Sequence, residues 1–315
     1  MNAAPLPDAD SAALQRALQT LETVILGKPM QVRLCLACLL ARGHLLIEDV
    51  PGVGKTTLAH ALAHVLGLAW HRVQFTSDLL PADIIGVSVF DRASQQFHFR
   101  QGPIFTQLLL ADEVNRASPR TQSALLEAME ERQVSADLTT YRLPDPFFVV
   151  ATQNPHEQLG TYPLPESQLD RFLMRVTLGY PDAAHERELL RSGERRDLLP
   201  QITPALDAQT VVRIQSDVRE VHISDALLDY TQALIARTRD RSDLKLGLSP
   251  RAGQGLIRAA QAWAYLSGRR AVLPEDIQAV LPSVVAHRLE RREPAAPGET
   301  QVIAQELIRA VPVPL

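Results

Sequence analysis

A glycine-rich stretch between an apolar run and a helical pattern holds residues suited to phosphate chemistry. The stretch is EDVPGVGKTT, residues 48–57. Its Gly54, Lys55 and Thr56 match the end of the phosphate-binding pattern G-x-x-x-x-G-K-[ST]. Asp49 stands where that pattern usually opens with glycine. Because an aspartate can still turn the chain, we interpret the stretch as a phosphate-binding loop, with a plain turn before a helix as the alternative.

The chemistry of such a loop comes from N–H donors and one cation gathered at the start of a helix. Backbone N–H groups can cradle phosphate oxygens there, and the helix dipole favours anions. Lys55 would reach the β- and γ-phosphates, and the Thr56 hydroxyl would bind Mg²⁺. ATP and Mg²⁺ are therefore the expected cofactors, and the loop residues expected to hold them are Gly52, Val53, Gly54, Lys55, Thr56 and Thr57.

Two adjacent carboxylates follow a second apolar run. LLLADE, residues 108–113, predicts a buried strand that ends in Asp112 and Glu113, the pattern of a Walker B element. Asp112 can hold Mg²⁺ through its water shell, and Glu113 can orient or deprotonate the attacking water. A strand that ends in two acids is common by itself. This one follows the loop lysine by 57 residues, room for one strand–helix unit and a hairpin, so the two motifs together favour an ATPase.

Three further polar residues could complete such a site. Asn154 follows the run VVATQ and would lie between the two motif-bearing strands, where it could position water; capping a loop is the alternative. Arg171 ends a short helix in LPESQLDRF and could reach the γ-phosphate of a neighbouring subunit. Arg251 begins a later helix and could touch the γ-phosphate of its own subunit. For either arginine alone, a surface salt bridge is the better interpretation.

The hydrophobic pattern predicts the framework that must position these residues. Short apolar runs alternate with helical patterns, which indicates an α/β fold. The five strands are expected at 44–49, 71–75, 107–114, 147–154 and 174–178. Two hairpins, in which polar turns separate alternating segments, are expected at 86–100 and 134–142.

After Pro181 the periodicity is helical only. We therefore predict an α/β domain over residues 1–181 and an all-helical domain over residues 182–315. The expected helical segments lie near 182–193, 207–218, 224–240, 250–268, 274–290 and 299–311.

Composition and charge limit the class of protein. The chain has 315 residues, of which 46% are hydrophobic, and its net charge of −4 gives no general attraction to nucleic acid. No apolar run approaches ~18 residues, so no membrane span is expected. The acidic N-terminus lacks a signal-peptide pattern, which favours a cytoplasmic location. Cys35 and Cys38 form a C-x-x-C that we interpret as two buried thiols rather than a redox pair.

The order of several longer segments resembles the MoxR family of AAA+ ATPases. The resemblance extends from about residue 20 to residue 290, and its Walker B segment and the segment from ATQNP to QLDRF are long and specific. The family also tolerates aspartate at position 49. The segments are VILGKP, EDVPGVGKTT, LLLADEVNRASPRTQSALLEAMEERQV, VVATQNPHEQLGTYPLPESQLDRFLMRVTLGYP and LSPRAGQGL.

The resemblance implies a five-stranded parallel sheet in the order 5-1-4-3-2 with a helical lid. The hairpin at 86–100 would be the helix-2 insert, and that at 134–142 the pre-sensor-1 hairpin. Family members form rings, usually hexamers, with ATP at subunit interfaces. They are thought to act as chaperones that mature or activate protein clients, often with a von Willebrand factor A domain protein.

The resemblance also implies roles for individual residues. Asn154 would be the first sensor, Arg171 the arginine finger and Arg251 the second sensor. Ile25 and Gly27 fall where the adenine normally packs.

Two other functions of the same broad fold stay open. A DNA or RNA motor would also use such hairpins, although their tips, DRASQ and SADLTT, hold at most one arginine and no lysine. In this chain, only the sequences of the segments LPESQLDRF and NRASPRTQ favour a MoxR protein over a chelatase-type subunit. Arg116 and Arg120 follow the Walker B strand closely, and either a subunit interface or a salt bridge would explain them.

Overall fold

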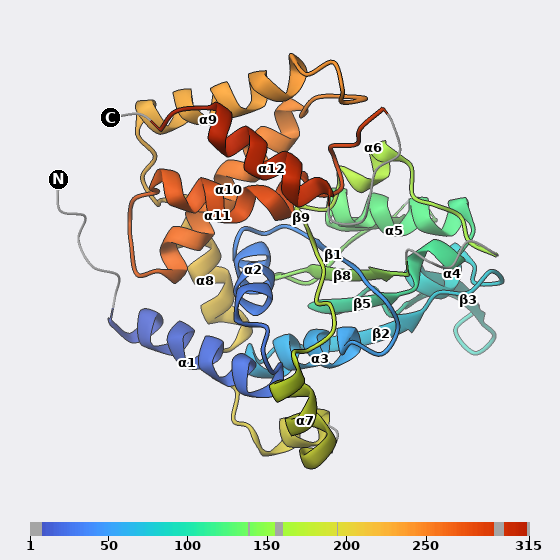
Figure 1. Ribbon diagram of the computed structural model, residues 1–315. Coiled ribbons are helices and arrows are strands. Elements are labelled where there is room, and N and C mark those ends of the chain that lie inside the picture. Colours follow the sequence, from blue (N-terminus) through green and yellow to red (C-terminus); the bar gives the residue numbers. More distant parts are fainter. Residues whose placement is uncertain (1–7, 138, 155–159, 194, 293–298, 314–315) are drawn as a thin grey trace.

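A five-stranded parallel sheet forms the centre of the computed structural model, which describes residues 8–137, 139–154, 160–193, 195–292 and 299–313 (Figure 1). Its strand order is β2-β5-β8-β1-β9. This order confirms the 5-1-4-3-2 arrangement that the family resemblance implied. The strands are β1 (Leu45–Glu48), β2 (Trp70–Gln74), β5 (Leu108–Asp112), β8 (Phe148–Gln153) and β9 (Met174–Val176).

Helices cover both faces of the sheet, so its central strands are apolar up to the polar residues at their carboxyl ends. In β1, Leu45 and Ile47 belong to one hydrophobic core and Leu46 to the other, because successive strand residues point to opposite faces. The first core includes α1 (Asp8–Val24), α2 (Pro29–Leu40) and α3 (Lys55–Val65), and the second includes α4 (Pro81–Ile85) and α5 (Pro119–Glu131).

The helical pattern predicted after Pro181 is confirmed. Within this part α10 packs against α8, α9 and α11, and it also packs against α2. The first hydrophobic core therefore runs from α1–α3 into the helical lid without a break. The boundary at 181/182 stays a prediction, and this core extends across it. The elements are α7 (Ala183–Ser192), η2 (Arg195–Gln201), α8 (Ala208–Arg219), α9 (Asp225–Arg239), α10 (Pro250–Leu266), α11 (Pro274–Val285) and α12 (Glu299–Ala310).

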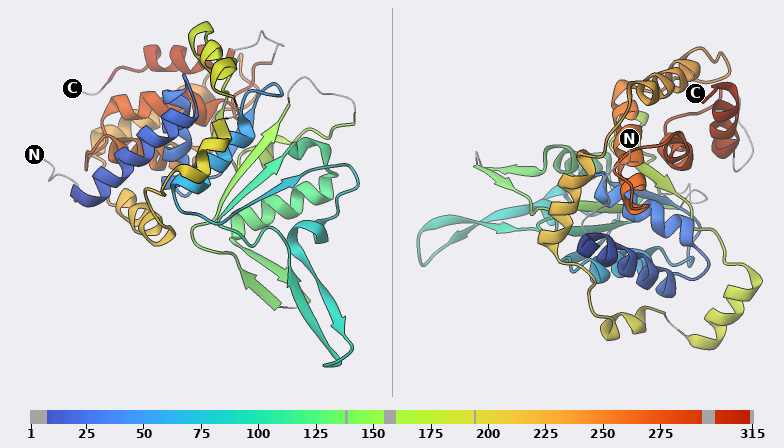
Figure 2. Two further views of the ribbon diagram at one scale, coloured as in Figure 1. Left: turned by 90° about the horizontal axis from the view of Figure 1, so that it is seen from below. Right: turned by 90° about the vertical axis from the view of Figure 1, so that its left-hand side faces the viewer.

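Both predicted hairpins are present. The longer one, β3–β4, projects away from the sheet (Figure 2). Its bounds are β3 (Gly86–Asp91) and β4 (Gln96–Gln101), and those of the shorter one are β6 (Gln133–Ala136) and β7 (Thr139–Arg142). Two short elements went unpredicted because each is about a single turn, and these are α4 and η1 (Val114–Arg116). The short helix expected in LPESQLDRF is present as α6 (Glu166–Leu169).

Some predicted features lie outside the described residues. These are the order of the extreme N-terminus, residues 1–7, and residues 155–159 of the quoted segment that begins VVATQN. In the ranges that are described, we find no helix with the length and apolar character needed to cross a bilayer.

The two cysteines lie in α2, and neither side chain is accessible to solvent. Burial raises the pKa of Cys35 to about 12 and that of Cys38 well above its usual range. The prediction of two buried thiols is thus confirmed.

We expect neither thiol of the native protein to react with a thiol reagent at pH 8, because the reactive species is the thiolate and both pKa values lie far higher. Colour development with a disulfide reagent checks this, with guanidinium-unfolded protein as the control in which both thiols react. Reaction of native protein at the rate of a free cysteine would contradict the burial.

Candidate nucleotide site and arginine face

The phosphate-binding loop leaves β1 and enters α3 at Lys55. Gly52 and Gly54 have φ values of 84° and 94°, a left-handed conformation that favours glycine. A Cβ at either position would meet no atom within 4 Å, so backbone conformation rather than crowding explains these glycines. Gly54 caps α3 without any side-chain hydrogen bond, which leaves the first N–H groups of the helix for a ligand.

The Lys55 ammonium lies between the ends of two central strands. It donates to the carbonyl oxygens of Asp49 at 2.6 Å and of Gln153 at 3.5 Å. These residues follow β1 and end β8, so the cation lies at the carboxyl edge of the sheet, beside the loop. This is the edge at which ligands bind in open parallel sheets.

Asp49, the departure from the usual loop pattern, is almost fully buried. Its carboxylate accepts N–H bonds from Val50 at 2.8 Å, Leu178 at 2.6 Å and Gly179 at 2.7 Å. The last two residues follow β9, so this side chain ties the loop to the chain that leaves the sheet. A glycine at position 49 could not make these bonds.

Asp112 of the Walker B strand is buried at the same edge. One carboxylate oxygen accepts a 2.5 Å hydrogen bond from the Thr152 hydroxyl, and the other accepts N–H bonds from Arg72, the shorter at 2.7 Å. The Thr152 oxygen in turn accepts the backbone N–H of Glu113 at 2.9 Å. Thr152 therefore links both acids to the central strand β8.

Glu113 is held by two side chains. Its carboxylate accepts from Gln74 at 2.8 Å and from Arg116 at 2.9 Å. The Arg116 contact supports the salt-bridge interpretation of that residue. Arg72 and Gln74 both come from β2, two residues apart and thus on one face of the strand. That alternation in HRVQF, together with the implied order that places this strand beside the Walker B strand, was the signal by which sequence reasoning could have found them.

Asn154 follows β8 directly, and its side chain is buried. Since β8 lies between β5 and β1, the residue stands between the two motif-bearing strands, as predicted. No group of three or more His, Cys, Asp or Glu side chains in the described ranges is arranged to hold a metal ion.

A cavity of about 460 Å³ adjoins the loop, within the range of small-molecule sites. Of the predicted nucleotide residues, its lining includes Ile25, Gly52, Val53, Gly54 and Thr57. An apolar wall beside N–H donors suits a purine base and its phosphates. Sequence reasoning missed the wall contributed by α7 and the segment before it, which consists of Tyr180, Pro181, Leu189 and Leu190.

Gly27 is not part of this lining. Its φ is 69°, and a Cβ there would come within 2.8 Å of Nδ1 of His185. The position therefore requires glycine for its turn and for the close approach of α7, and its predicted contact with adenine stays a prediction.

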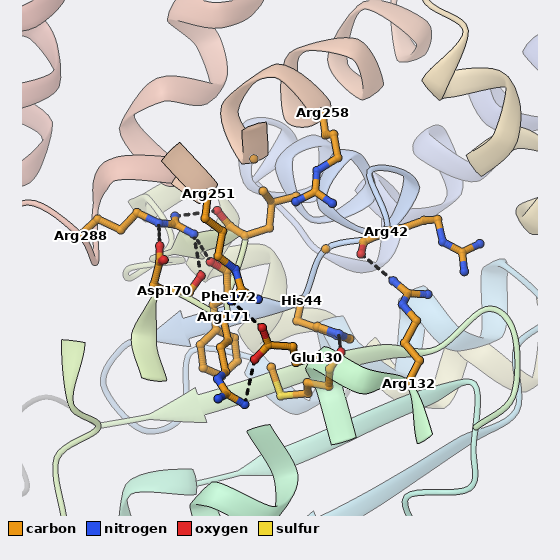
Figure 3. A pocket seen from close by; sticks show the side chains of 14 residues that line it. Arg42, His44, Glu130, Arg132, Asp170, Arg171, Phe172, Arg251, Arg258 and Arg288 are labelled. Carbon is orange, nitrogen blue, oxygen red and sulfur yellow. Dashed lines mark hydrogen bonds and ion pairs between the residues drawn. The ribbon is translucent and has the colours of Figure 1, made fainter. Parts of the chain in front are cut away.

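Arg171 and Arg251 lie together on the opposite edge of the sheet (Figure 3). Glu130 at the end of α5 pairs with both, at 3.2 Å and 2.8 Å. Arg171 lies just before β9. Leu173, also just before β9, donates its N–H to the carbonyl of His44, and His44 lies just before β1. The four residues of β1 span ~13 Å and separate this edge from the loop.

This arrangement does not place Arg251 beside the loop of its own chain, and the expectation that it touches a phosphate there stays a prediction. The helix that bears it, α10, packs on α2 and places its first turn against α5 rather than over the loop. Ser249 caps that helix by accepting from the N–H of Ala252, which fixes where the turn begins.

We expect Asp49→Ala to lower the free energy of unfolding by roughly 2–4 kcal/mol, because it leaves buried N–H groups without an acceptor. Asp49→Gly, which restores the common loop pattern, should be no better, whereas Asp49→Asn keeps one acceptor oxygen and should lose about half as much. Urea unfolding measures all three variants. Full stability of Asp49→Gly would show that the loop does not depend on this carboxylate.

Comparison with known proteins agrees with this geometry. A family model described as "ATPase family associated with various cellular activities (AAA)" matches residues 44–174, and an AAA lid domain model matches residues 236–308. The chain is 44% identical over 305 residues to the Bacillus subtilis protein YeaC, covering 96% of this chain and 95% of that one. It is 39% identical over 318 residues to Chaperone MoxR1 of Mycobacterium tuberculosis, covering 97% and 84%.

A solved structure gives the same result for the fold. The crystal structure of a protein from Cytophaga hutchinsonii, provisionally described as an ATPase, matches with a TM-score of 0.88 and 36% identity, over 97% of this chain and 96% of that one. The chain belongs to the MoxR family of AAA+ ATPases.

Proposed function

We propose that the protein binds ATP with Mg²⁺ at the loop, hydrolyses it to ADP and phosphate, and uses the cycle to remodel protein partners. The observation that carries this proposal is the meeting of Lys55, Asp112 and Glu113 at the carboxyl edge of adjacent strands. Mg²⁺ in such sites typically takes one or two protein oxygens and completes its shell with phosphate and water. Asp112 and the Thr56 hydroxyl are the two protein groups proposed to hold it.

Glu113 is the proposed base for the attacking water. Gln74 and Arg116 hold its carboxylate in a fixed orientation, and Asn154 is buried between the same strands. Preorganised groups of this kind act by positioning the water and accepting its proton. Ile25 and Gly27 remain the proposed neighbours of the adenine.

The arginine face completes the proposed site from a second subunit. Arg171 and Arg251 share Glu130 on the edge away from their own loop, so a phosphate that they contact would belong to a neighbouring copy. An arginine supplied in this way neutralises charge in the transition state. A homo-oligomeric ring, hexameric as in other AAA+ proteins, follows from this assignment.

The partners are proposed to be proteins. The relative MoxR1 is named a chaperone, and a von Willebrand factor A domain protein acting with a client enzyme fits the family resemblance. A cytoplasmic location is part of the same proposal. The net charge of −4 gives nucleic acid no general attraction, which makes a nucleic-acid motor a less favoured alternative. A chelatase-type subunit is less favoured because several relatives are named MoxR.

We expect Glu113→Gln to bind ATP but to hydrolyse it ~10²–10⁴-fold more slowly, because the amide cannot accept the proton of water. Lys55→Ala is the matched variant, expected to lose nucleotide binding. Equilibrium binding of a fluorescent ATP analogue and phosphate release measure the two properties. Ordinary nucleotide affinity in Lys55→Ala would overturn the site.

The Glu113→Gln protein also tests the remodelling function. Captured from its native cell extract with ATP, it should retain a protein with a metal-ion-dependent adhesion site together with a client. The Lys55→Ala protein in the same extract should retain neither. Nucleic acid that dissociates as salt rises, in place of protein, would favour the motor.

We expect Arg171→Ala to bind ATP normally and to hydrolyse it ~10³–10⁵-fold more slowly, because the charge on the transferred phosphate loses a partner. Mixing this variant with Glu113→Gln should restore part of the turnover, since some interfaces then combine an intact base with an intact arginine. Phosphate release across mixing ratios measures this. Absence of rescue at every ratio would show that the arginine does not act between subunits.

A further inference from the structure

Arg171 and Arg251, which form the arginine face, border a pocket of about 140 Å³ between the α/β core and α10 (Figure 3). Its lining is unusual in charge, because six arginines face only two carboxylates. The arginines are Arg42, Arg132, Arg171, Arg251, Arg258 and Arg288, and the carboxylates are Glu130 and Asp170. In a chain of net charge −4, this is a local concentration of positive charge in a concave site.

Both carboxylates are already engaged at one end of the pocket. Glu130 holds Arg171 and Arg251, and Asp170 accepts from Arg288 at 2.7 Å. These contacts account for three of the six arginines.

On the other side of the pocket, Arg42 forms an ion pair with Asp145 at 2.9 Å. Asp145 is not part of the pocket lining. Arg132 donates to the backbone carbonyl of Arg42 at 2.8 Å, a neutral acceptor that does not balance its charge. The side chain of Arg258, an exposed residue in the middle of α10, makes no hydrogen bond and no ion pair with any described residue. Arg132 and Arg258 are therefore the arginines of the pocket that the structure leaves without a carboxylate.

The electrostatics of these two side chains agree with the geometry. Burial, and after it the charge of Arg42, lowers the pKa of Arg132 to about 10, although Asp145 acts in the opposite direction. Burial likewise lowers the pKa of Arg258, and the nearby Arg219 and Arg251 lower it further. Arginine surrounded by arginine is destabilised unless an anion lies nearby.

The remaining polar side chain of the pocket adds no charge. His44 accepts the N–H of Val149 at Nδ1, so its Nε2–H donates to the carbonyl of Met129. Burial holds the pKa of this imidazole at about 3, and it stays neutral.

We propose that Arg132 and Arg258 form a second anion site, which takes a phosphate-type oxyanion. A guanidinium offers a planar fork of N–H donors that matches two oxygens of such an ion, and two guanidiniums across a small pocket can hold one tetrahedral anion from both sides. The inference goes beyond the proposed function, because this site needs neither the loop nor a neighbouring subunit. The anion is a free ion from solution, and a phosphate presented by a second copy of the chain is the other source that the experiment separates from it.

Inorganic phosphate and pyrophosphate are the probes, titrated by calorimetry into Lys55→Ala protein in acetate buffer. The Lys55→Ala background removes phosphate binding at the loop. Titrations at several protein concentrations separate the two sources, because the affinity for a free ion does not depend on the protein concentration. We expect saturable binding of phosphate to the parent. The affinity should fall at least tenfold in Arg258→Gln, because one charge-assisted contact is lost.

A matched variant controls the titration. Arg237→Gln removes an exposed arginine of α9 that lies outside the pocket lining, and it should bind phosphate as the parent does. Absence of saturable binding in the parent, or equal affinity in Arg258→Gln and the parent, would overturn the proposal, as would binding that appears only at concentrations where the protein assembles.

A melting experiment tests the same site without relying on a heat of binding. In phosphate-free buffer, Arg258→Gln should melt at a higher temperature than the parent, because one of several crowded positive charges is gone. Added phosphate should raise the melting temperature of the parent and not that of the variant. A variant that is destabilised in both conditions would show that Arg258 serves the packing of α10 and not an anion.

Discussion

The buried carboxylate of Asp49 is the contact on which the nucleotide site depends. It fixes where the phosphate-binding loop begins and, through the N–H groups of Leu178 and Gly179, where the chain leaves β9. The chain that follows β9 continues to Tyr180 and α7, which form the apolar wall of the cavity. One side chain therefore sets the distance between the phosphate end and the base end of the site. A loop that opened with glycine would need another residue to make this link.

The two edges of the sheet have different tasks. The carboxyl edge gathers Lys55, Asp112 and Glu113, because the loop and the Walker B strand both end there. The amino edge gathers arginines, because α5 and α10 return to it and Glu130 draws two of them together. The carboxyl edge contains the lysine and both acids, but Arg171 and Arg251 lie on the other edge. If these arginines contribute to phosphoryl transfer as proposed, they do so at the loop of a neighbouring copy.

Much of this could be predicted from the sequence, and what could not has a physical reason. Loop, strands and hairpins were predictable because their patterns are local, and the strand order came from resemblance. The roles of Arg72, Thr152 and Gln74 depend on which strands are neighbours, and that is decided by packing far along the chain. The position of Arg251 relative to the loop could not be predicted for the same kind of reason. The sequence pattern of an arginine in the first turn of a helix is the same whether that helix packs over the loop or, as α10 does, on α2.

The continuous core between α2 and α10 has a mechanical consequence. A lid that shares its hydrophobic interior with the sheet cannot swing as a separate body without exposing that interior to water, at a cost of ~25 cal/mol for each Å² of apolar surface. The continuous core therefore disfavours independent motion of the lid. Under the proposed function, we expect movements driven by nucleotide to occur between copies of the chain and at the projecting β3–β4 hairpin.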